Sequence, residues 1–282
     1  MTSFSVIVST YDRPEFLERV LIGYAMQSDR DFELVIADDG SGEATGDVIQ
    51  NARKSRDLVI THVRHEHSGF RKTIILNRSI ANSSGSYLMF TDGDCIPRRD
   101  LIATHKRLAR RSRYVAGGYV KLPSGITTAI TPGDIESGAI TDLGWLKSRG
   151  WQPGRRALRL TRSWRMGSLY DFLTPTAADF HGNNASAFRD DIYAVNGFEG
   201  EMGYGGLDQA LGYRLQNAGV KGYQARHRAV TMHLHHDRPY RNPDVVRKNR
   251  EIMKRIKQSG ESRARLGIAE LDTDPTVTID RG

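Results

Sequence analysis

Apolar runs and helical spacings alternate along the first 120 residues of this chain. Residues 4–9, 32–37 and 58–63 are apolar runs long enough to be buried strands. The segments between them carry apolar residues three or four positions apart, as Leu17 and Leu21 do, which predicts helices. Strands joined by helical crossovers imply a parallel sheet with right-handed connections. We therefore predict the α/β class, with a central, mostly parallel sheet flanked by helices.

The pattern continues, with one interruption, to about residue 260. A fourth strand is predicted at 87–92, followed by a helix at 100–111 and a strand at 114–119. Order resumes after the interruption with a strand at 181–189, and the last predicted helix starts at Asn242. We predict four parts: a first half at 1–122, an inserted region at 123–168, a second half at 169–260, and a tail at 261–282 that packs loosely or is mobile.

Two carboxylates end the fourth strand. Asp92, Gly93 and Asp94 follow directly on its apolar run. Residues two apart share one side of an extended chain, so both carboxylates can face one ligand, and Gly93 lets the backbone come close to it. Two close carboxylates suit a hard divalent cation that holds phosphate. An acidic turn without a ligand is the alternative, because Asp and Gly are ordinary turn residues.

Further polar residues follow the other strands. Asp38 and Asp39 end the second strand. Arg71 and Lys72 precede a helix, where positive charge and free backbone donors could together meet a phosphate. A solvated basic turn is the alternative for this pair.

The second half contains an acidic helix start and a cluster of histidines. A glycine-rich loop leads to Asp208 in the first turn of a helix, where an Asp also suits the helix dipole, so a structural role is the alternative. His233, His235 and His236 lie at the end of a later strand. Side chains alternate between the faces of a strand, so the sequence leaves open which of the three approach one site.

The inserted region is basic and aromatic. It contains Trp145, Trp151 and Trp164, and a stretch around 155–165 that would place Arg155, Arg159 and Arg162 on one side if it were a helix. From Trp145 to Met166 there are seven cations and no acidic residue, whereas a solvated face normally mixes signs. We expect this segment to dock on anionic lipid or on an anionic acceptor; a helix that simply lies on the core is the alternative.

Composition and charge indicate which partners and which cellular compartment suit the protein. The 282 residues carry a formal net charge of +8, with a pI of about 9.6, which favours polyanionic partners such as nucleotides, nucleic acid, acidic glycans or an anionic membrane surface. The single cysteine, Cys95, fits a reducing compartment and a place in the core. The sequence shows neither a signal peptide nor a membrane span, so we expect a cytoplasmic protein.

Taken together, these residues resemble the inverting family-2 nucleotide-sugar glycosyltransferases with the GT-A fold, a Rossmann-like α/β architecture. The closest similarity is to the branch whose C-terminal half is similar to the galactosyltransferases and chondroitin-type polymerases. It extends from Ser5 to about Asn249. It is specific because the following motifs occur in order: Ser9-Thr10-Tyr11-Asp12-Arg13-Pro14, Asp38-Asp39-Gly40-Ser41, Gly69-Phe70-Arg71-Lys72 with Asn77-Arg78, Asp92-Gly93-Asp94, Gly182-Asn183-Asn184, Asn196-Gly197-Phe198, Gly203-Tyr204-Gly205-Gly206-Leu207-Asp208 and a late histidine.

The resemblance implies a role for each matching residue. The first half would bind a nucleotide-sugar, with uracil and ribose at Thr10, Asp12 and Asp39, and the second half would bind the acceptor. The implied donor-binding residues are Thr10, Tyr11, Asp12, Arg13, Asp39, Arg71, Lys72, Asn77, Asp92 and Gly93. Those implied on the acceptor side are Asn183, Tyr204, Gly205 and Gly206, with Asp208 as catalytic base. Those implied for the metal are Asp94, His233 and His236.

The implied activity is transfer of a sugar from a UDP-linked donor to a hydroxyl of a glycan or lipid-linked acceptor. Mg²⁺ prefers oxygen ligands, so an imidazole ligand favours Mn²⁺. The family usually has an acidic residue just before the base, and Leu207 stands there instead, which puts the acceptor and the sugar in doubt.

Two other classes remain as alternatives. A nucleotidyltransferase would show a glycine-rich basic loop after the first strand, and residues 10–14 are not one. A nucleic-acid-binding module could use the Arg/Trp stretch, but it would leave both acidic sites without a purpose, so we expect no nucleic-acid partner.

Overall fold

The computed structural model describes residues 3–237 and 242–282. The first half of the chain contains β1 (Phe4–Thr10), α1 (Pro14–Ala25), β2 (Glu33–Asp38), α2 (Glu43–Arg56), β3 (Ile60–Arg64), α3 (Lys72–Ala81), β4 (Tyr87–Asp92), β5 (Cys95–Pro97), α4 (Leu101–Leu108), β6 (Arg113–Ala116) and β7 (Gly118–Lys121). Short helices follow: α5 (Ser124–Ala129), α6 (Pro132–Glu136), η1 (Ala139–Thr141), α7 (Leu143–Ser148), η2 (Arg155–Leu160) and α8 (Trp164–Leu173). The remainder is β8 (Ala185–Phe188), α9 (Arg189–Ala194), α10 (Leu207–Asn217), β9 (Lys221–Gln224), β10 (Val230–His233), α11 (Pro243–Ser259) and β11 (Thr278–Asp280).

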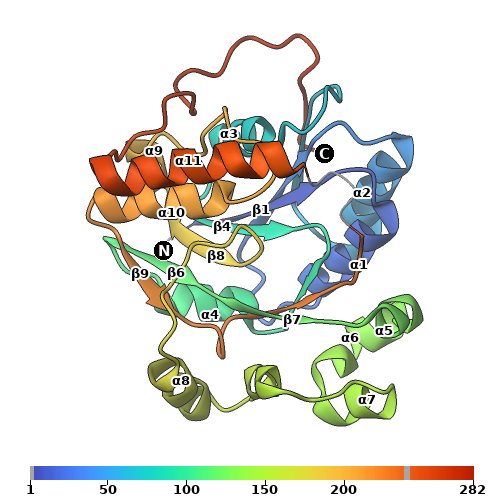
Figure 1. Cartoon of the computed structure of the whole chain (residues 1–282). Helices are drawn as coiled ribbons and strands as arrows, with labels where there is room; N and C mark the ends of the chain where they lie inside the picture. Colours follow the sequence, from blue (N-terminus) through green and yellow to red (C-terminus); the bar gives the residue numbers. More distant parts are fainter. Residues whose placement is uncertain (1–2, 238–241) are drawn as a thin grey trace.

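A twisted sheet divides the molecule into two layers (Figure 1). Its strand order is β11-β3-β2-β1-β4-β8-β6-β9, and β3, β2, β1 and β4 are parallel neighbours. β8 runs antiparallel to both β4 and β6, and a second sheet has the order β5-β10-β7. The predicted α/β class with a mostly parallel central sheet is confirmed.

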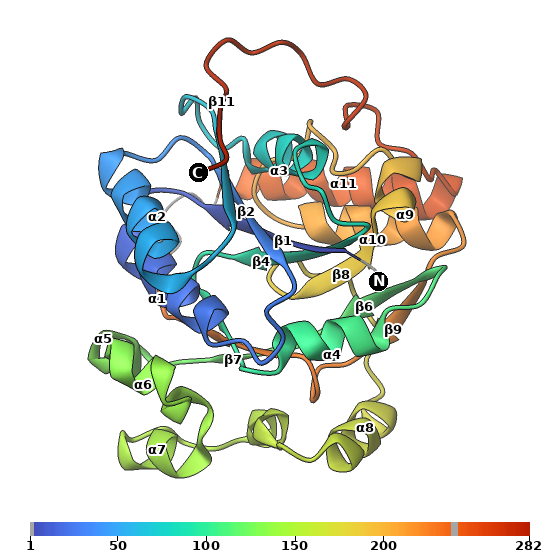
Figure 2. The same ribbon diagram turned by 180° about the vertical axis from the view of Figure 1, so that it is seen from behind.

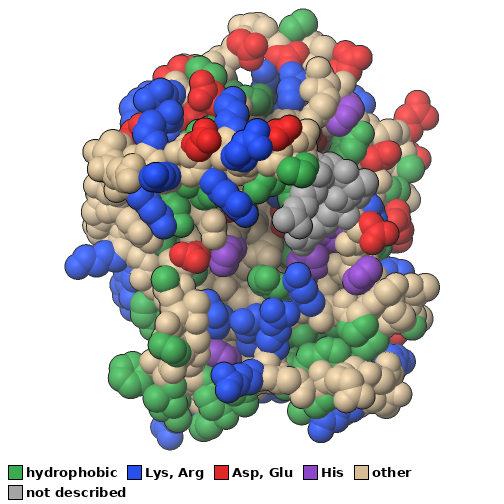
Figure 3. Space-filling model, viewed as in Figure 1, with side chains coloured by type: hydrophobic (Ala, Val, Ile, Leu, Met, Phe, Trp, Pro, Cys, Tyr) green, Lys and Arg blue, Asp and Glu red, His purple; other side chains and the backbone are tan. Residues whose placement is uncertain are grey.

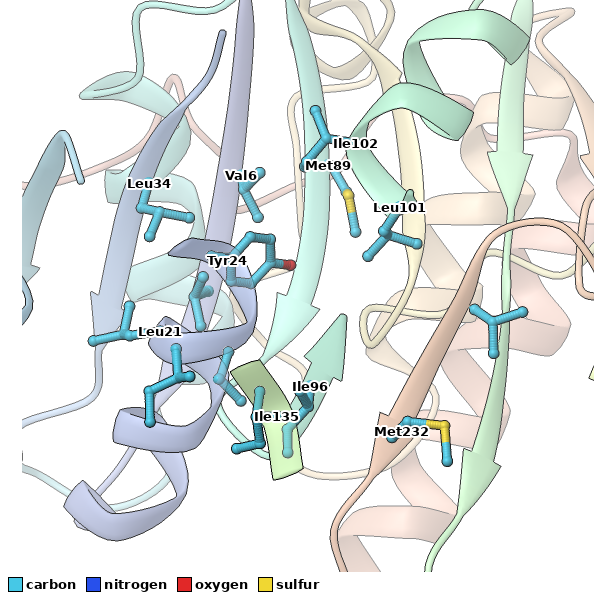
Figure 4. Close-up of a cluster of buried hydrophobic side chains, with 14 of the residues drawn as sticks. Val6, Leu21, Tyr24, Leu34, Met89, Ile96, Leu101, Ile102, Ile135 and Met232 are labelled. Atoms are coloured by element: carbon cyan, nitrogen blue, oxygen red, sulfur yellow. The ribbon is translucent and has the colours of Figure 1, made fainter. Parts of the chain in front are cut away.

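Both faces of the central sheet are buried, because successive side chains of each strand enter different cores. Val6 and Val8 of β1 pack with α1 and α4, whereas Ile7 packs with α3, α10 and α11. Figure 4 shows the first of these cores, in which Tyr24 and Met89 lie beside side chains of other elements. Figure 2 shows the same layers from behind. In the described part of the chain, no helix combines the length and the apolar character needed to cross a lipid bilayer.

The predicted strand at 114–119 is wrong in one respect: it is two strands in two sheets. The chain leaves the first sheet at Gly117, where a Cβ atom would lie 2.4 Å from side-chain atoms of Asn184. Asn184 Nδ2 also donates to the carbonyls of Gly118 and Ala229, so this buried amide connects the two sheets. The predicted strand at 181–189 is likewise shorter, because the chain turns before Ala185.

Residues 155–165 do not form one continuous helix, so the one-sided arrangement of Arg155, Arg159 and Arg162 that a helix would give is absent. Residues 155–160 form a short 3-10 helix, the chain is extended at Thr161, and α8 starts after Ser163, whose side chain accepts a hydrogen bond from the Met166 N–H. Arg159 does not lie on an exposed cationic face, because its guanidinium donates to the carbonyl of Tyr119. The inserted region packs on the first core through several side chains, among them Trp151, which is 8% exposed.

The tail packs more tightly than predicted. β11 adds an antiparallel strand beside β3 at the edge of the central sheet. Asp272 and Asp274 lie 2.9 Å and 3.4 Å from Nη2 of Arg78, and Ala264 is buried. The acidic residues Asp272 and Asp274 therefore attach the tail to the buried Arg78.

Candidate active site

The C-terminal ends of β1, β2 and β4 meet at one edge of the central sheet. The register pairs Thr10 with Asp38 and Ser9 with Asp92, so the motifs that follow these strands become neighbours. Gly93 packs so closely on β1 that its N–H donates to the Ser9 carbonyl at 2.8 Å. This is the edge at which open α/β sheets bind ligands.

The loops that follow β1, β2 and β3 are fixed by aromatic and acidic contacts. The ring of Tyr11 stacks on that of His67 with centroids 4.4 Å apart, and Asp12 has a φ of 46° while its N–H donates to Ser41 Oγ. Asp39 is buried, and its carboxylate is held by His65 Nε2 at 2.7 Å and by the Arg71 N–H at 3.1 Å. The three loops after β1, β2 and β3 therefore form one connected wall.

A lysine and two carboxylates form the centre of the site. Lys72 Nζ lies 2.5 Å from Asp92 Oδ1, which also accepts a hydrogen bond from Ser9 Oγ at 2.8 Å. Burial alone would lower the pKa of Lys72, but the charges of Asp92, Asp208 and Asp94 raise it above its usual value. The lysine is thus a permanent cation at the C-terminal end of β4.

Asp208 carries a carboxylate oxygen without a hydrogen-bond partner in the described part of the chain. Its Oδ1 is buried and has no hydrogen-bond partner among the described residues. The backbone of Gly182 packs against this carboxylate, and a Cβ atom there would lie 2.5 Å from Oδ1. Burial raises the pKa of Asp208 above the usual range for Asp, and the nearby Lys72 opposes this only in part.

Asp94 and two of the late histidines form a candidate metal centre. Asp94 Oδ2 lies 2.8 Å from His236 Nε2 and 3.9 Å from His233 Nε2, and the two imidazole rings stack with centroids 5.6 Å apart. Asp94, Cys95 and His233 offer ligand atoms within 4.8 Å of one another. A carboxylate and two imidazoles fit a transition metal such as Mn²⁺ better than Mg²⁺. Burial would raise the pKa of Asp94, but the hydrogen bond from His236 and the charge of His233 lower it to about 2.

The structure answers which histidines approach Asp94. β10 ends at His233, so the strand alternation no longer applies beyond it and His236 turns to the same side. His235 donates its backbone N–H to Thr127 Oγ1, and its imidazole forms no ion pair with Asp94 among the described residues. Asp92 and Asp94 do not share one partner: Asp92 pairs with Lys72, and Asp94 faces the histidines.

The glycine-rich loop before α10 is held by a residue that the sequence analysis missed. Asn249 of α11 donates through Nδ2 to the carbonyls of Gly203, Tyr204 and Gly205, at 2.7 to 3.2 Å. Gly205 and Gly206 have φ values of 107° and 84°, which other residues rarely adopt. The sequence carried one signal of this role: Asn249 is a polar residue on the apolar stripe of the last predicted helix.

Other predicted residues lie at this site or near it. Asn183 has a buried Oδ1 without a hydrogen-bond partner among the described residues, and Tyr204 packs edge-on against Phe70. Arg13 lies over the ring of Phe16, and the Arg71 side chain points to Asp274 of the tail. Figure 3 shows a hollow at the centre of this face with histidine side chains beside it.

Asn77 is a correction. It was expected to help hold a nucleotide, but it is fully buried. Its Nδ2 donates to the Phe198 carbonyl and its Oδ1 accepts from the Phe198 N–H, both at 2.8 Å. Both the Nδ2 and the Oδ1 atom of Asn77 thus bind the Phe198 backbone and hold the loop at 196–198. Asn77 therefore does not reach the site.

The fold and this edge define a glycosyltransferase of the GT-A class. The chain belongs to glycosyl transferase family 2, whose sequence model matches residues 5–197. It is 25% identical over 283 residues to the uncharacterized glycosyltransferase YfnE of Bacillus subtilis (strain 168), a match that covers 87% of this chain and 68% of that protein.

Two solved structures are similar in fold. One is the mannosyltransferase PcManGT from Pyrobaculum calidifontis in complex with GDP-Man and Mn²⁺, with a TM-score of 0.56 and 22% identity over 85% of this chain and 59% of that chain. The other is residues 1–349 of TarS from S. aureus in complex with UDP-GlcNAc, with a TM-score of 0.60 and 15% identity over 95% of this chain and 69% of that chain. The nucleotidyltransferase and nucleic-acid-binding alternatives are not favoured.

Proposed function

We propose that this protein is a metal-dependent, inverting glycosyltransferase that moves a sugar from a nucleotide-sugar to a hydroxyl of a glycan or lipid-linked glycan. The observation that carries the proposal is the unsatisfied Asp208 carboxylate beside the Lys72–Asp92 pair, at the edge that also holds Asp94 and His236. A UDP-linked donor is the proposed substrate, and Mn²⁺ the proposed cation, with Mg²⁺ as the alternative. The family membership, and the ligands in the PcManGT and TarS structures, support this proposal.

The donor would lie along the wall formed by Tyr11, Asp12 and Asp39. The stacked Tyr11 ring offers an apolar surface to a base, and the Lys72 ammonium offers positive charge to a diphosphate. Asp94, His233 and His236 would hold the cation, which neutralises charge on the leaving diphosphate when bound.

Asp208 would act as the general base. Its carboxylate takes the proton of the acceptor hydroxyl as that oxygen bonds to the anomeric carbon, and the bond from this carbon to the phosphate oxygen breaks with its electron pair leaving on the nucleoside diphosphate. A pKa raised by burial makes Asp208 a stronger base than a solvated Asp. A single displacement from the opposite face inverts the anomeric configuration.

Hydrolysis of a panel of nucleotide-sugars tests the donor and the metal together. We expect release of a nucleoside diphosphate from one UDP-sugar, with Mn²⁺ and without an acceptor, at a rate that EDTA abolishes. An NMR spectrum of the product formed with an acceptor reports inversion. No turnover of any nucleotide-sugar with either cation would contradict the proposal. We further propose a cytoplasmic location with peripheral attachment to the membrane that carries the acceptor.

A further inference from the structure

One side of α8 carries large apolar side chains that face solvent. Met166, Leu169, Phe172 and Leu173 are 39%, 45%, 85% and 63% exposed, and their spacing of three or four residues places them on one helix face, called here the α8 apolar face. Together with Leu158 they are five of the nine large apolar side chains that are exposed in the described residues. Exposed apolar groups are thus concentrated on one short segment.

The fold fixes this face outward. On the opposite side of α8, Asp171 is buried and accepts hydrogen bonds from the His227 N–H at 2.8 Å and from Arg228 Nε at 2.7 Å. The guanidinium carbons of Arg107 and Arg228 lie over the Trp164 ring, 3.9 Å and 5.0 Å from its centroid. Because α8 is anchored by its polar side, its apolar face cannot turn into the core.

Four exposed arginines lie on α8 or on the segment that leads into it. Arg155, Arg156, Arg162 and Arg165 are exposed, and no carboxylate of the described residues lies within ion-pair distance of them. Residues 143–170 contain no Asp or Glu at all. Figure 3 shows apolar side chains gathered at the position that α8 has in Figure 1, on the same face of the molecule as the central hollow.

We propose that the α8 apolar face and these four arginines dock the enzyme on an anionic phospholipid bilayer. A helix of this kind lies in the plane of the interface, with its apolar side chains between the headgroups and its cations on anionic lipid. A second copy of the chain fits less well, because joining two such faces would bring arginines against arginines. A polynucleotide would leave Phe172 and Leu173 in water. The docking surface itself does not depend on the proposed function. Only its purpose rests on that function: docking would bring the central hollow to a lipid-linked acceptor.

The test is co-sedimentation of the full chain with vesicles of phosphatidylglycerol and phosphatidylcholine, against vesicles of phosphatidylcholine alone. We expect binding to the anionic vesicles that weakens as salt rises. The double variant L169S/F172S should bind at least roughly tenfold more weakly, because two apolar side chains no longer enter the interface. R155S/R162S should lose severalfold in affinity and much of the salt dependence.

Matched controls come from exposed residues elsewhere. Val59→Ser removes a side chain that is 67% exposed, outside the inserted region, and K248S/K254S removes two exposed cations of α11; both should bind vesicles as the parent does. Equal binding of L169S/F172S and the parent, or equal binding of the parent to both vesicle types, would overturn the proposal. So would a dimer in sedimentation velocity that L169S/F172S abolishes, because the face would then belong to a second copy.

The outcome is separable from that of the proposed function. UDP binding with Mn²⁺ is measured on the same variants and should be unchanged, since none of them lies at the sheet edge. Vesicle binding without any UDP binding would retain the docking surface and reject the glycosyltransferase site.

Discussion

The side chains of the candidate site differ in how many of their polar atoms have hydrogen-bond partners in the protein. Asp39 has partners for both of its carboxylate oxygens, whereas Asp208 leaves one buried oxygen without any among the described residues. A buried, unsatisfied carboxylate costs stability, so its presence points to a substrate group that completes it.

Asp208→Asn tests the base. The amide has the same shape but cannot take a proton, so we expect turnover to fall roughly 10²-fold or more while UDP affinity stays near that of the parent. Stability should not fall, because the substitution removes a buried charge whose pKa burial has raised. Turnover and UDP binding that collapse together, or a much lower melting temperature, would assign Asp208 a structural role.

The same residue predicts a pH dependence. The proposed base works as a carboxylate, and burial raises its pKa above the usual range for Asp. Activity should therefore be full above that raised pKa and fall as the pH drops through it. We expect this acid limb in the profile of kcat/KM measured with saturating Mn²⁺. The residual activity of Asp208→Asn should lack it; an identical limb in that variant would mean that another group titrates.

Asp94→Ala tests the metal centre. One ligand lost from a small set is not easily replaced, so we expect metal-dependent binding of UDP to be abolished in calorimetric titration with Mn²⁺. Asp47→Ala, which removes an exposed carboxylate of α2, is the control and should bind as the parent does. The same UDP affinity in Asp94→Ala and the parent would reject the assignment.

At the scale of elements, α11 holds the loop that leads to Asp208, the proposed base. Three carbonyls of that loop depend on the side-chain amide of Asn249, and Met253 of the same helix fills the space where a Cβ of Gly206 would stand. Contacts with α11 therefore hold the loop that leads into α10, the helix that carries Asp208.

Asn249→Ala should reduce kcat by roughly ten- to a hundredfold, since small misplacements of a catalytic group are costly. The unsatisfied carbonyls should also cost about 1–3 kcal/mol in the free energy of unfolding. UDP affinity should change little, because the donor wall is built by other loops. Asn51→Ala, at an exposed position of α2, is the control for kcat and for urea unfolding. An unchanged kcat in Asn249→Ala would show that the loop keeps its shape without this amide.

At the scale of the whole molecule, a buried ion pair ties the tail to the second core. Glu199 and Arg214 are both fully buried, with Oε2 and Nη2 2.6 Å apart. Glu199 also accepts hydrogen bonds from the N–H groups of Arg265 and Leu266, and Arg214 reaches Glu261 at 3.2 Å. The tail is thereby part of the folded unit.

Glu199→Ala should therefore lower the free energy of unfolding by about 3–5 kcal/mol, because it leaves a buried guanidinium poorly compensated. Glu201→Ala, two residues away and exposed, should change it by less than about 0.5 kcal/mol. Urea denaturation measures both. A loss below about 1 kcal/mol in Glu199→Ala would show that Glu261 alone compensates Arg214.

The sequence by itself determined the α/β class, the order of the first four strands and the place of Asp92, Asp94 and Asp208 at element ends. These features depend on local periodicity and on turn residues, and parallel strands bring their C-terminal ends to one edge whatever the remaining packing. Tertiary structure alone decided which side chains lie at the site and which contacts they make. Asn77 is enclosed by the Phe198 backbone, His236 rather than His235 turns to Asp94, and α8 faces its apolar side outward because Asp171 holds the other side. Each of these depends on contacts between residues far apart in the chain, which no local pattern records.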